Sequence, residues 1–349
     1  MKQKILVTGA AGFIGSRVAH LLAKQGDEVI GVDNINDFYD VRLKYARLKE
    51  CGIECESENI PYGRWYSSKF SNYNYRFVRL SIESKTALDL LFGYEKFDKI
   101  IHLAAQAGVQ FSKVHPFAYM KSNLSGFLDI LESCRHHKVN HLVYASSSSV
   151  YGMNTNETFS ESDNTNSPVS LYAASKIANE AMAHCYAQQY GISCIGLRFF
   201  TVYGPWGRPD MSPILFADKI RKNEKITLYK NGEMIRDFTY IDDIAEGIIC
   251  ATNHTLNAIK CPNNVPSQIY NIGSSNPIKM IDFVNELEEI YGKKANIELT
   301  DETRPGDVIK TCADISKIKD ELIFRPKWKL ENGLKEFVKW YKSDKNPLK

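Results

Sequence analysis

Short apolar runs alternate with helix-like segments through the first half of the chain. The runs are four or five residues long, and the segments between them carry apolar residues at helical spacing. Apolar strands separated by helices are typical of a parallel sheet that is covered on both faces. We therefore predict an α/β fold built on a doubly wound parallel sheet. The predicted strands are Lys4–Val7, Glu28–Val32, Ile100–Leu103 and Leu142–Ala145, and the predicted helices are about Phe13–Gln25 and Ser122–His136.

Two stretches depart from this alternation. Residues 35–76 are rich in Tyr, Lys and Glu, and we expect a helix and a surface loop there. After about residue 196 the Pro and Gly content rises and the strand–helix rhythm weakens. We predict a first domain over residues 1–195 and a smaller C-terminal α/β domain that comprises most of residues 196–349. The chain is expected to return to the large sheet around residues 238–270.

The charge balance argues against some classes of partner. Lys and Arg number 44 and Asp and Glu number 41, so the net charge of +3 gives no electrostatic reason to expect nucleic acid. The apolar run near the N-terminus stops at Thr8-Gly9, which is too short for a signal peptide, and no later stretch could span a bilayer. We predict neither a nucleic-acid partner nor membrane insertion.

The eight cysteines form no C-x-x-C pair. Most occur in apolar context, and Cys51 and Cys55 have no His or Cys cluster nearby in the sequence. We interpret them as reduced thiols of a cytoplasmic protein, and we predict no metal site.

A G-x-x-G-x-x-G motif follows the first predicted strand and opens the first predicted helix. Its glycines are Gly9, Gly12 and Gly15. Glycine permits a tight turn and lets a dinucleotide pyrophosphate approach the positive helix N-terminus. Asp33 ends the second predicted strand, where a carboxylate can accept hydrogen bonds from the adenosine ribose and would repel a 2′-phosphate. The motif predicts a Rossmann-type domain over residues 1–195 that binds NAD rather than NADP.

Tyr172 and Lys176 lie four residues apart in a predicted helix, so both side chains share one face. An ammonium group near a phenol lowers the phenol's pKa, and such a tyrosine can accept a proton from a sugar hydroxyl while hydride leaves to the cofactor. Ser146–Ser149 is a cluster of hydroxyls at the carboxyl end of a predicted strand, which is where open α/β sheets bind ligands. Together these residues predict an oxidoreductive site.

At this point the chain resembles the extended short-chain dehydrogenase/reductase superfamily over nearly its whole length. Within that superfamily, residues 36–40 (NDFYD), 103–109 (LAAQAGV) and 199–211 (FFTVYGPWGRPDM) are similar to the corresponding segments of UDP-glucuronate 4-epimerases. The resemblance implies NAD as cofactor and a UDP-sugar as substrate. It also implies a homodimer that pairs through helices, one of which bears Tyr172.

The resemblance also assigns roles residue by residue. Ser147 would hydrogen-bond the sugar O4 beside Tyr172 and Lys176, and Arg236 and Arg304 would bind the UDP diphosphate, for which a planar guanidinium is well suited. Asn123 would be a structural polar residue near the site. Implied cofactor-binding residues are Gly9, Gly12, Phe13, Ile14, Gly15, Asp33, Asn34, Ser81, Ile82, Leu103, Ala104, Ala105, Tyr172 and Lys176; implied substrate-binding residues are Ser148, Ser149, Thr201, Arg208, Arg236, Arg304 and Asp307.

The residues after Ser147 favour one reaction. Related dehydratases carry Asp-Glu where this chain has Ser148-Ser149, and the decarboxylases carry Glu at the second position. Neutral hydroxyls leave a reaction that Tyr172 and NAD can complete, namely reversible oxidation at C4 and return of hydride to the opposite face of the sugar. We hypothesise that Ser148, Ser149 and Thr201 hold the substrate carboxylate so that the 4-keto intermediate keeps its carbon dioxide.

Two departures from the family pattern keep alternatives open. Gln110 stands where the family has Arg, and Ser81 stands where it has Asp to meet the adenine. The lost charge at Gln110 leaves open a 4-epimerase of neutral UDP-sugars, such as UDP-glucose or UDP-N-acetylglucosamine. A UDP-glucuronate decarboxylase is disfavoured by Ser149. A non-catalytic NAD-binding regulator is the alternative from another class, because Rossmann folds support many roles.

Overall fold

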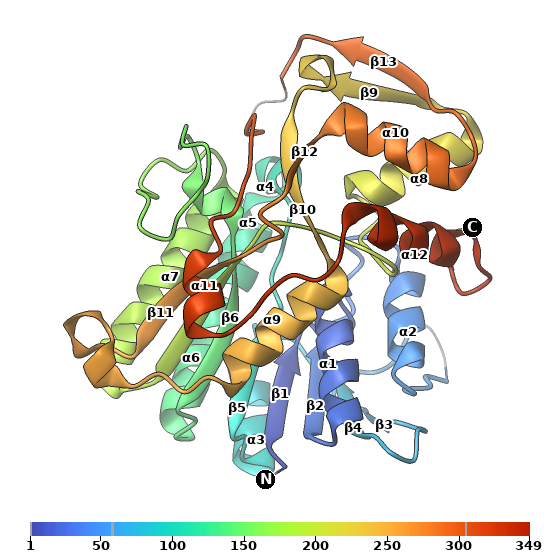
Figure 1. Cartoon of the computed structure of the whole chain (residues 1–349). Helices are drawn as coiled ribbons and strands as arrows, with labels where there is room; N and C mark the ends of the chain where they lie inside the picture. Colours follow the sequence, from blue (N-terminus) through green and yellow to red (C-terminus); the bar gives the residue numbers. More distant parts are fainter. Residues whose placement is uncertain (1, 57–58, 304–305) are drawn as a thin grey trace.

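The computed structural model describes residues 2–56, 59–303 and 306–349, and its centre is a large twisted sheet (Figure 1). Within the described residues this sheet has eight strands in the order β11-β7-β6-β5-β1-β2-β4-β3. All neighbouring strands are parallel except the antiparallel edge pair β3–β4. The strands are β1 Lys4–Thr8, β2 Glu28–Asp33, β3 Trp65–Ser67, β4 Asn74–Arg79, β5 Lys99–His102, β6 His141–Ser147, β7 Ser193–Phe199 and β11 Ser267–Ile272.

Helices cover both faces of the large sheet. Its central strands are buried on both sides; in β1, for example, Ile5, Leu6 and Val7 are almost fully buried although successive side chains point to opposite faces. Helices α1 and α9 pack together on one face, with α2 beside α1, while α3, α6 and α7 pack on the other (Figure 1). Their bounds are α1 Phe13–Gln25, α2 Val41–Glu50, α3 Lys85–Glu95, α6 Gly126–His136, α7 Leu171–Tyr190 and α9 Ile241–Asn253. The fold is therefore the predicted doubly wound, Rossmann-type α/β fold.

The C-terminal part adds two small sheets above the carboxyl ends of the large sheet (Figure 1). One has the order β12-β10-β8 and the other pairs β13 with β9. The return of the chain to the large sheet consists of α9 and β11. The sequence-based boundary at residue 195 falls within β7, and the division into two domains stays a prediction. The elements of this part are β8 Thr201–Tyr203, β9 Lys225–Tyr229, β10 Ile235–Tyr240, β12 Pro277–Lys279, β13 Asn296–Thr300, α8 Ser212–Lys222, α10 Met280–Tyr291, α11 Ser316–Glu321 and α12 Leu330–Lys342.

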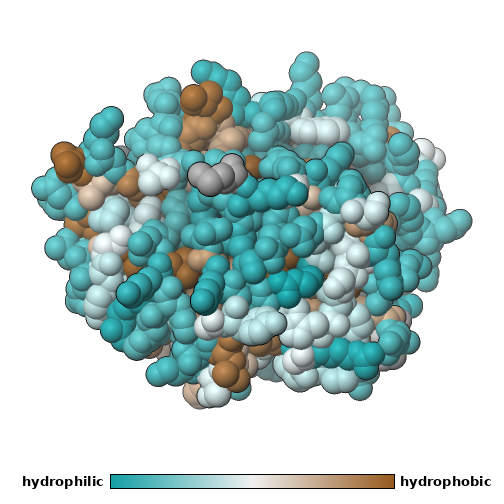
Figure 2. Space-filling model, turned by 90° about the horizontal axis from the view of Figure 1, so that it is seen from below, coloured by the Kyte–Doolittle hydropathy of each residue, from teal (hydrophilic) through white to brown (hydrophobic). Residues whose placement is uncertain are grey.

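The strand order changes direction between β1 and β5, since the chain proceeds from β1 outwards through β2 and β4 and then returns to β5 on the other side. The loops after β1 and β5 therefore diverge at the carboxyl end of the sheet and leave a crevice there, which is the usual ligand site of such folds. The opposite end of the molecule is mainly hydrophilic, with hydrophobic residues in scattered spots (Figure 2). Such scattered residues are ordinary for a protein surface.

The structure confirms the predicted strands and helices to within a few residues but corrects one segment. Residues 35–76 do contain a helix, α2, yet the expected loop also includes β3 and the start of β4. Tyr75 is 1% exposed and pairs with Val29 of β2. The expectation of a loop is wrong because Tyr75 and Phe77 alternate with polar residues at the two-residue period of a strand, and those polar residues give a buried aromatic strand the composition of a surface stretch.

The helix predicted at 122–136 also differs at its start. Residues Met120–Ser125 form a π-helical stretch before α6 begins at Gly126. Two short helices precede it, α4 Val109–Val114 and α5 Pro116–Tyr119. Within the described chain, no helix combines the length and apolarity needed to cross a membrane.

Candidate active site

The glycine turn after β1 forms one wall of a cavity of about 420 Å³ at the carboxyl end of the sheet. Gly9 has a φ of +70°, and a Cβ there would lie 2.9 Å from the backbone nitrogen of Ala104. A Cβ on Gly15 would lie 2.1 Å from the carbonyl oxygen of Gly9. Only glycine allows this turn to pack so closely against β5 and α1. Gly12, the N-cap residue of α1, leaves that helix N-terminus uncovered, so the turn fits the diphosphate of a dinucleotide.

Asp33 ends β2 beside this turn and is 8% exposed. Its carboxylate accepts hydrogen bonds from the backbone N–H groups of Ala11 (3.2 Å) and Ile35 (2.8 Å). The Lys44 ammonium, which is also buried, lies 3.6 Å from Asp33 Oδ1 and donates to Asn36 Oδ1 at 2.7 Å. Asp33 thus holds the turn as well as facing the cavity. The sequence analysis missed Lys44, because nothing in the pattern of α2 distinguishes it from a surface lysine.

The loop after β5 is fixed from behind by two buried polar side chains. Thr8 Oγ1 accepts hydrogen bonds from the N–H groups of Leu103 (3.2 Å) and Ala104 (3.1 Å) and lies 2.9 Å from His102 Nδ1. Burial, with a smaller contribution from the Lys176 charge, lowers the pKa of His102 to about 3, so this imidazole is neutral. The pair orders the Leu103–Ala105 stretch, which lines the cavity.

Ser81 and Ile82 are the two residues that the sequence predicts beside the adenine. Ile82 lines the cavity, but Ser81 is not among the lining residues, and its hydroxyl accepts a hydrogen bond from the N–H of Glu83 at 3.3 Å. Ile82 also packs closely on α6, where a Cβ on Gly126 would lie 2.9 Å from its Cδ1. The predicted role of Ser81 stays a prediction.

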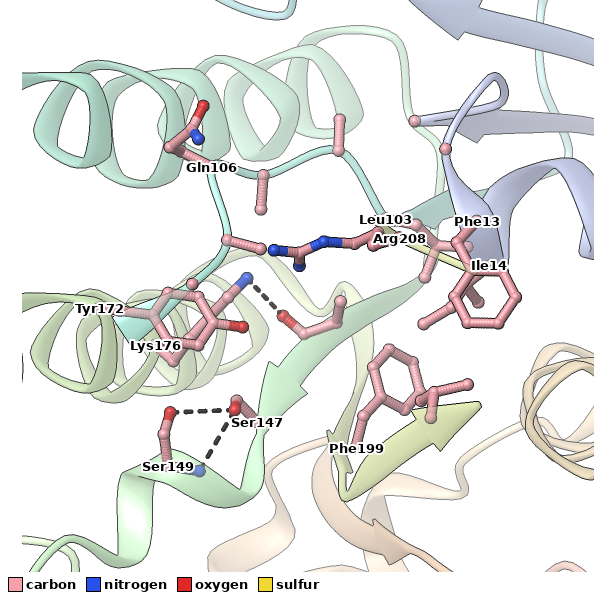
Figure 3. A pocket seen from close by; sticks show the side chains of 18 of the residues that line it. Phe13, Ile14, Leu103, Gln106, Ser147, Ser149, Tyr172, Lys176, Phe199 and Arg208 are labelled. Atoms are coloured by element: carbon pink, nitrogen blue, oxygen red, sulfur yellow. Dashed lines mark hydrogen bonds between the residues drawn. The ribbon is translucent and has the colours of Figure 1, made fainter. Parts of the chain in front are cut away.

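The carboxyl end of β6 and the start of α7 bring the expected reactive groups together (Figure 3). Ser170 caps α7 by accepting a hydrogen bond from the N–H of Ala173, which starts the helix that carries Tyr172 and Lys176. Ser147 Oγ accepts hydrogen bonds from Ser149, from its hydroxyl at 2.9 Å and its N–H at 3.2 Å. These contacts fix the Ser147 hydroxyl on the side of the cavity that Tyr172 occupies.

Burial dominates the electrostatics of the reactive pair. It raises the pKa of Tyr172, against which a hydrogen bond with Ser147 and the charge of Arg208 act. It lowers the pKa of Lys176 to about 8, opposed by the charge of Glu180. The Lys176 ammonium donates to the carbonyl of Ala145 at 2.8 Å. The expected lowering of the phenol pKa is therefore not produced by the protein groups alone, because desolvation outweighs the nearby positive charge.

A buried ion pair lies directly behind Lys176. Glu180, one turn further along α7, accepts hydrogen bonds from Arg198 Nε (2.9 Å) and Nη2 (2.8 Å) and from the Ser146 hydroxyl (2.5 Å). The side chains of Glu180 and Arg198 are 12% and 5% exposed. Sequence reasoning missed this pair, although the four-residue spacing from Tyr172 through Lys176 to Glu180 was a visible signal that all three share one helix face.

The structure places Asn123 beneath this site. It lies in the π-helical stretch before α6 and is 2% exposed. Its amide oxygen accepts from the N–H of Gln106 at 2.7 Å, and its nitrogen donates to the carbonyl of Gln106 and to the Ser175 hydroxyl. This residue therefore ties the loop after β5 to α7, and the irregular helix turn presents it there, as such turns often do at functional sites.

The far side of the cavity is formed by the C-terminal part of the chain. Arg208 reaches across it, with its guanidinium directed towards Tyr172 (Figure 3). This arginine pairs with Asp210 at 2.5 Å and lies over the ring of Phe38. Thr201, at the start of β8, and Ser148 also line the cavity. Arg304 lies outside the described residues.

Arg236 lines the same side and donates to the carbonyls of Ile235 (2.8 Å) and Ile309 (3.2 Å). Burial lowers its pKa, while the charge of Asp307 acts in the opposite direction. Asp307 also lines the cavity and accepts a hydrogen bond from Gln110 Nε2 at 3.3 Å, so Gln110, one of the two departures from the family pattern, contacts a predicted substrate-binding residue.

The neighbouring Asp237 is fully buried and was missed by the sequence analysis. Its carboxylate accepts hydrogen bonds from Ser274, from both N–H and hydroxyl, and from the N–H groups of Ser275 and Ala313. It joins β10 to two loops and thereby fixes the strand that presents Arg236. Nothing in its sequence context distinguishes it from a surface aspartate.

Over the described residues, no group of three or more His, Cys, Asp or Glu side chains is arranged to hold a metal ion. All eight cysteines are free thiols, of which Cys51 and four others are buried.

Comparisons with known proteins agree with this geometry. The family model of the NAD dependent epimerase/dehydratase family matches residues 5–273. Protein CapI of Staphylococcus aureus is 42% identical, over 97% of this chain and 98% of its own length. UDP-glucuronate 4-epimerase 4 of Arabidopsis thaliana is also 42% identical, over 97% of this chain and 75% of its own length.

Among solved structures, UDP-glucuronic acid 4-epimerase from Bacillus cereus, in complex with UDP-glucuronic acid and NAD, superposes with a TM-score of 0.83. It is 32% identical, with 97% of this chain and 99% of that chain covered. A family match over most of the chain, relatives at this level of identity and a full-length structural match all point the same way. The chain belongs to the NAD dependent epimerase/dehydratase family.

Proposed function

We propose that the protein is an NAD-dependent 4-epimerase that interconverts UDP-glucuronate and UDP-galacturonate through a transient 4-keto sugar. The observation that carries the proposal is the reactive cluster itself: Tyr172, Lys176 and Ser147 share one end of the cavity with the hydroxyls of Ser148 and Ser149. Of the described lining residues only Asp33 and Asp307 are carboxylates, and these are engaged by Lys44 and Gln110 respectively. Such a site can exchange a proton through a phenol but has no acid–base pair for loss of water.

We assign cofactor binding to residues 1–195 and binding of the UDP-sugar mainly to residues 196–349. The glycine turn, Asp33 and the Leu103–Ala105 stretch would hold NAD, which when bound supplies a reversible hydride acceptor. The full set assigned to the cofactor is Gly9, Gly12, Phe13, Ile14, Gly15, Asp33, Asn34, Ser81, Ile82, Leu103, Ala104, Ala105, Tyr172 and Lys176.

Within this arrangement Tyr172 takes the proton from the sugar O4 and later returns it. Ser147 is aligned by Ser149 to hydrogen-bond the same oxygen, and a hydrogen bond from Ser147 also favours the phenolate form of Tyr172. Lys176 places a positive charge one helix turn from the phenol, and the charge of Glu180 opposes the lowering of that lysine's pKa by burial. Burial leaves the pKa of Tyr172 raised, so we assign its further lowering to the positive charge that oxidised NAD would add when bound.

The carboxylate of the substrate is assigned to Ser148, Ser149 and Thr201, and the diphosphate to Arg236 and Arg304, with Arg208 and Asp307 completing the sugar site. A 4-keto uronic acid is a β-keto acid and loses carbon dioxide readily when its carboxylate is free to turn. Neutral hydroxyl donors hold that group without supplying a proton. Thr201→Val tests the assignment: we expect UDP-pentose to appear beside the epimer, and unchanged turnover without pentose would remove Thr201 from this role.

One observation favours a second candidate, a 4-epimerase of neutral UDP-sugars. The family arginine is replaced by Gln110, whose amide donates to Asp307, so α4 presents at that position an amide rather than a guanidinium. A neutral sugar would not need the missing charge.

We also propose a cytoplasmic homodimer. Eight free cysteines are consistent with a reducing compartment. Helices α6 and α7 lie side by side on one face of the sheet, and Leu128 of α6 is 40% exposed. Ala181 and Cys185 of α7 are exposed as well, so this face could accept the same two helices of a second copy. Light scattering with sedimentation would measure the assembly.

The decisive experiment incubates the purified protein with UDP-glucuronate, without added NAD, and identifies the products by NMR. UDP-galacturonate with its carboxylate retained supports the proposal and indicates that NAD is retained through purification. UDP-pentose would instead indicate a decarboxylase. Turnover of UDP-glucose or UDP-N-acetylglucosamine alone would favour the second candidate, and binding of NAD with no sugar turnover would leave a regulator.

A further inference from the structure

Arg47 of α2 is 1% exposed, and it joins the cofactor-binding turn to the substrate-binding loop. Its Nη1 donates to the carbonyl of Ala11 at 3.1 Å, inside the glycine turn. Its Nε and Nη2 donate to the carbonyl of Trp206 at 3.0 and 2.7 Å, and Nη2 also donates to the carbonyl of Gly207 at 3.1 Å. Trp206 and Gly207 directly precede Arg208, so a single guanidinium spans both halves of the pocket.

The acceptors of this guanidinium are all neutral. Besides the three carbonyls, Nη1 donates to the hydroxyl of Tyr39 at 2.5 Å, and the Tyr39 ring lies 5.3 Å from the guanidinium carbon. A buried charge that is hydrogen-bonded only to neutral oxygens is costly, and a structure keeps one where the geometry it imposes is needed. Tyr39 lines the pocket, and Arg208 lies over the ring of its neighbour Phe38. Arg47 is therefore also connected to Arg208 through Tyr39 and Phe38.

The loop that Arg47 holds is strained. Trp206 has a φ of +65°, which is unfavourable for a residue with a bulky side chain. Its ring is packed against Trp340 of α12, at a centroid distance of 5.2 Å, while its carbonyl is held by two donors of Arg47. Such a conformation persists only when its surroundings hold it from several sides. Arg47 is therefore one of the restraints that keep Arg208 in position.

The glycine turn is also fixed by Asp33. Ala11 donates its N–H to Asp33 and accepts a hydrogen bond from Arg47 at its carbonyl, so one residue connects Asp33, which we assign to the adenosine ribose, to the arginine that restrains the substrate loop. Any shift of this turn on binding a dinucleotide changes the position of the guanidinium, and through it the carbonyls of Trp206 and Gly207.

From this geometry we propose that Arg47 is a positioning residue that couples the two binding sites, so that binding of the dinucleotide and binding of the nucleotide-sugar strengthen each other. The inference rests on the proposed function for the identity of the two ligands. Coupling of this kind is reciprocal: the factor by which one ligand tightens the other is the same in both directions. It has the consequence that protein which already carries its cofactor binds the nucleotide-sugar more tightly than protein without it, by the same factor.

The test measures NAD affinity by equilibrium dialysis, with and without saturating UDP-glucuronate, whose sugar reaches the site assigned to Arg208, for the full-length protein and two variants. In the wild type we expect UDP-glucuronate to tighten NAD binding on the order of tenfold. In Arg47→Met this factor falls to near one, because the bridge between the loops is lost. Arg47→Lys keeps the charge and the aliphatic stem but cannot reach both loops, so it should show the same loss of coupling. It provides the test if Arg47→Met fails to fold.

Arg42→Met is the matched control, since Arg42 lies on the same helix with a half-exposed side chain paired to Asp40. It should retain the full coupling factor. Circular dichroism checks folding of every variant, and a merely structural role would lower stability or both affinities without changing the factor. If the wild type binds UDP-glucuronate with a coupling factor of one, or if the factor is unchanged in both Arg47 variants, the inference about Arg47 is wrong while the proposed function stands. If the wild type binds no UDP-glucuronate, the proposed function is wrong as well.

Discussion

The end of the pocket that we assign to the cofactor (the cofactor end), with the glycine turn, Asp33 and the Leu103–Ala105 stretch, is built mostly from backbone. The end that we assign to the substrate (the substrate end), with Thr201, Arg208, Arg236 and Asp307, is built from side chains on separate elements. At the cofactor end, the turn, strand and helix that make contact are adjacent in sequence, and their shape follows from glycine geometry. At the substrate end the strand that presents Arg236 is fixed through its neighbour Asp237, which binds Ser274 and Ala313 from distant loops. Arg208 likewise lies over the ring of Phe38, which is far away in the chain.

The difference teaches where change is tolerated. A turn with a Cβ-to-backbone clearance of 2.1 Å at Gly15 cannot be varied without loss of the cofactor site. Side chains on separate elements can be exchanged one at a time without moving the backbone that carries them. By this geometry the glycine turn is the more constrained end of the pocket.

The largest effect is expected where the two ends meet, at Tyr172. Tyr172→Phe removes the proton acceptor and should lower kcat about 10³-fold, because a positioned general base contributes roughly 10²–10⁴-fold. Binding of NAD and UDP should be retained, since the phenyl ring keeps its packing. Steady-state kinetics and calorimetry measure the two quantities. Tyr190→Phe, at the half-exposed end of the same helix, is the control and should keep wild-type turnover.

Gly15→Ala is expected to disrupt the glycine turn at the cofactor end. The added Cβ would lie 2.1 Å from the Gly9 carbonyl, so the turn must move, and we expect NAD affinity to fall on the order of 10²-fold. NAD retained after gel filtration is the measurement. Gly93→Ala on α3 serves as control, because its Cβ would meet only the His137 ring at 3.5 Å. Full retention of NAD in Gly15→Ala would show that the turn is more adaptable than the comparison implies.

Asp33→Ser tests the preference of the cofactor end for NAD over NADP. It removes the carboxylate that repels a 2′-phosphate and leaves the Lys44 ammonium, now 3.6 Å from where that carboxylate stood, as an uncompensated cation. The ratio of NADP to NAD affinity should rise about tenfold, a typical effect of one favourable charge contact. Adding Lys44→Met should cancel the gain. An unchanged ratio in Asp33→Ser would mean that Lys44 does not reach the ribose.

The smallest effect is a pH dependence at the reactive pair, between the two ends of the pocket. The pKa of Lys176 is lowered to about 8 by burial, so its ammonium is charged below that pH and becomes neutral above it. Since the charge supports the Tyr172 phenolate, turnover should decline several-fold on the alkaline side of about pH 8.

Glu180→Gln removes the charge that raises the pKa of Lys176, and the alkaline limb should then move to lower pH. Arg198 is the other charged group beside Glu180. The control variant is Glu132→Gln, at the surface of α6. Profiles of kcat from pH 6 to 10 make the comparison. If the alkaline limb of the kcat profile does not move in Glu180→Gln, the titration of Lys176 is not the cause of the pH dependence.

Much of the site could be predicted from sequence because its parts are local. Gly9, Gly12 and Gly15 form one turn, and Tyr172 and Lys176 lie on one helix face, so their geometry follows from short-range rules. The roles given to individual residues, among them Ser81 and Arg208, remain predictions. Tyr75 and Phe77 show that local patterns also have a limit, since the polar residues between them give a buried strand the composition of a surface loop.

The sequence by itself determined the doubly wound sheet, the position of the dinucleotide turn and the spacing of the reactive pair, because each depends on backbone propensity or on periodicity within one element. Only the tertiary structure decided which charges became buried. Arg47, Asp237 and the Glu180–Arg198 pair look like surface residues in the sequence, and each takes its hydrogen bonds wholly or largely from elements distant in the chain. Whether such a group is solvated or holds a site in place depends on that packing, which no local pattern records.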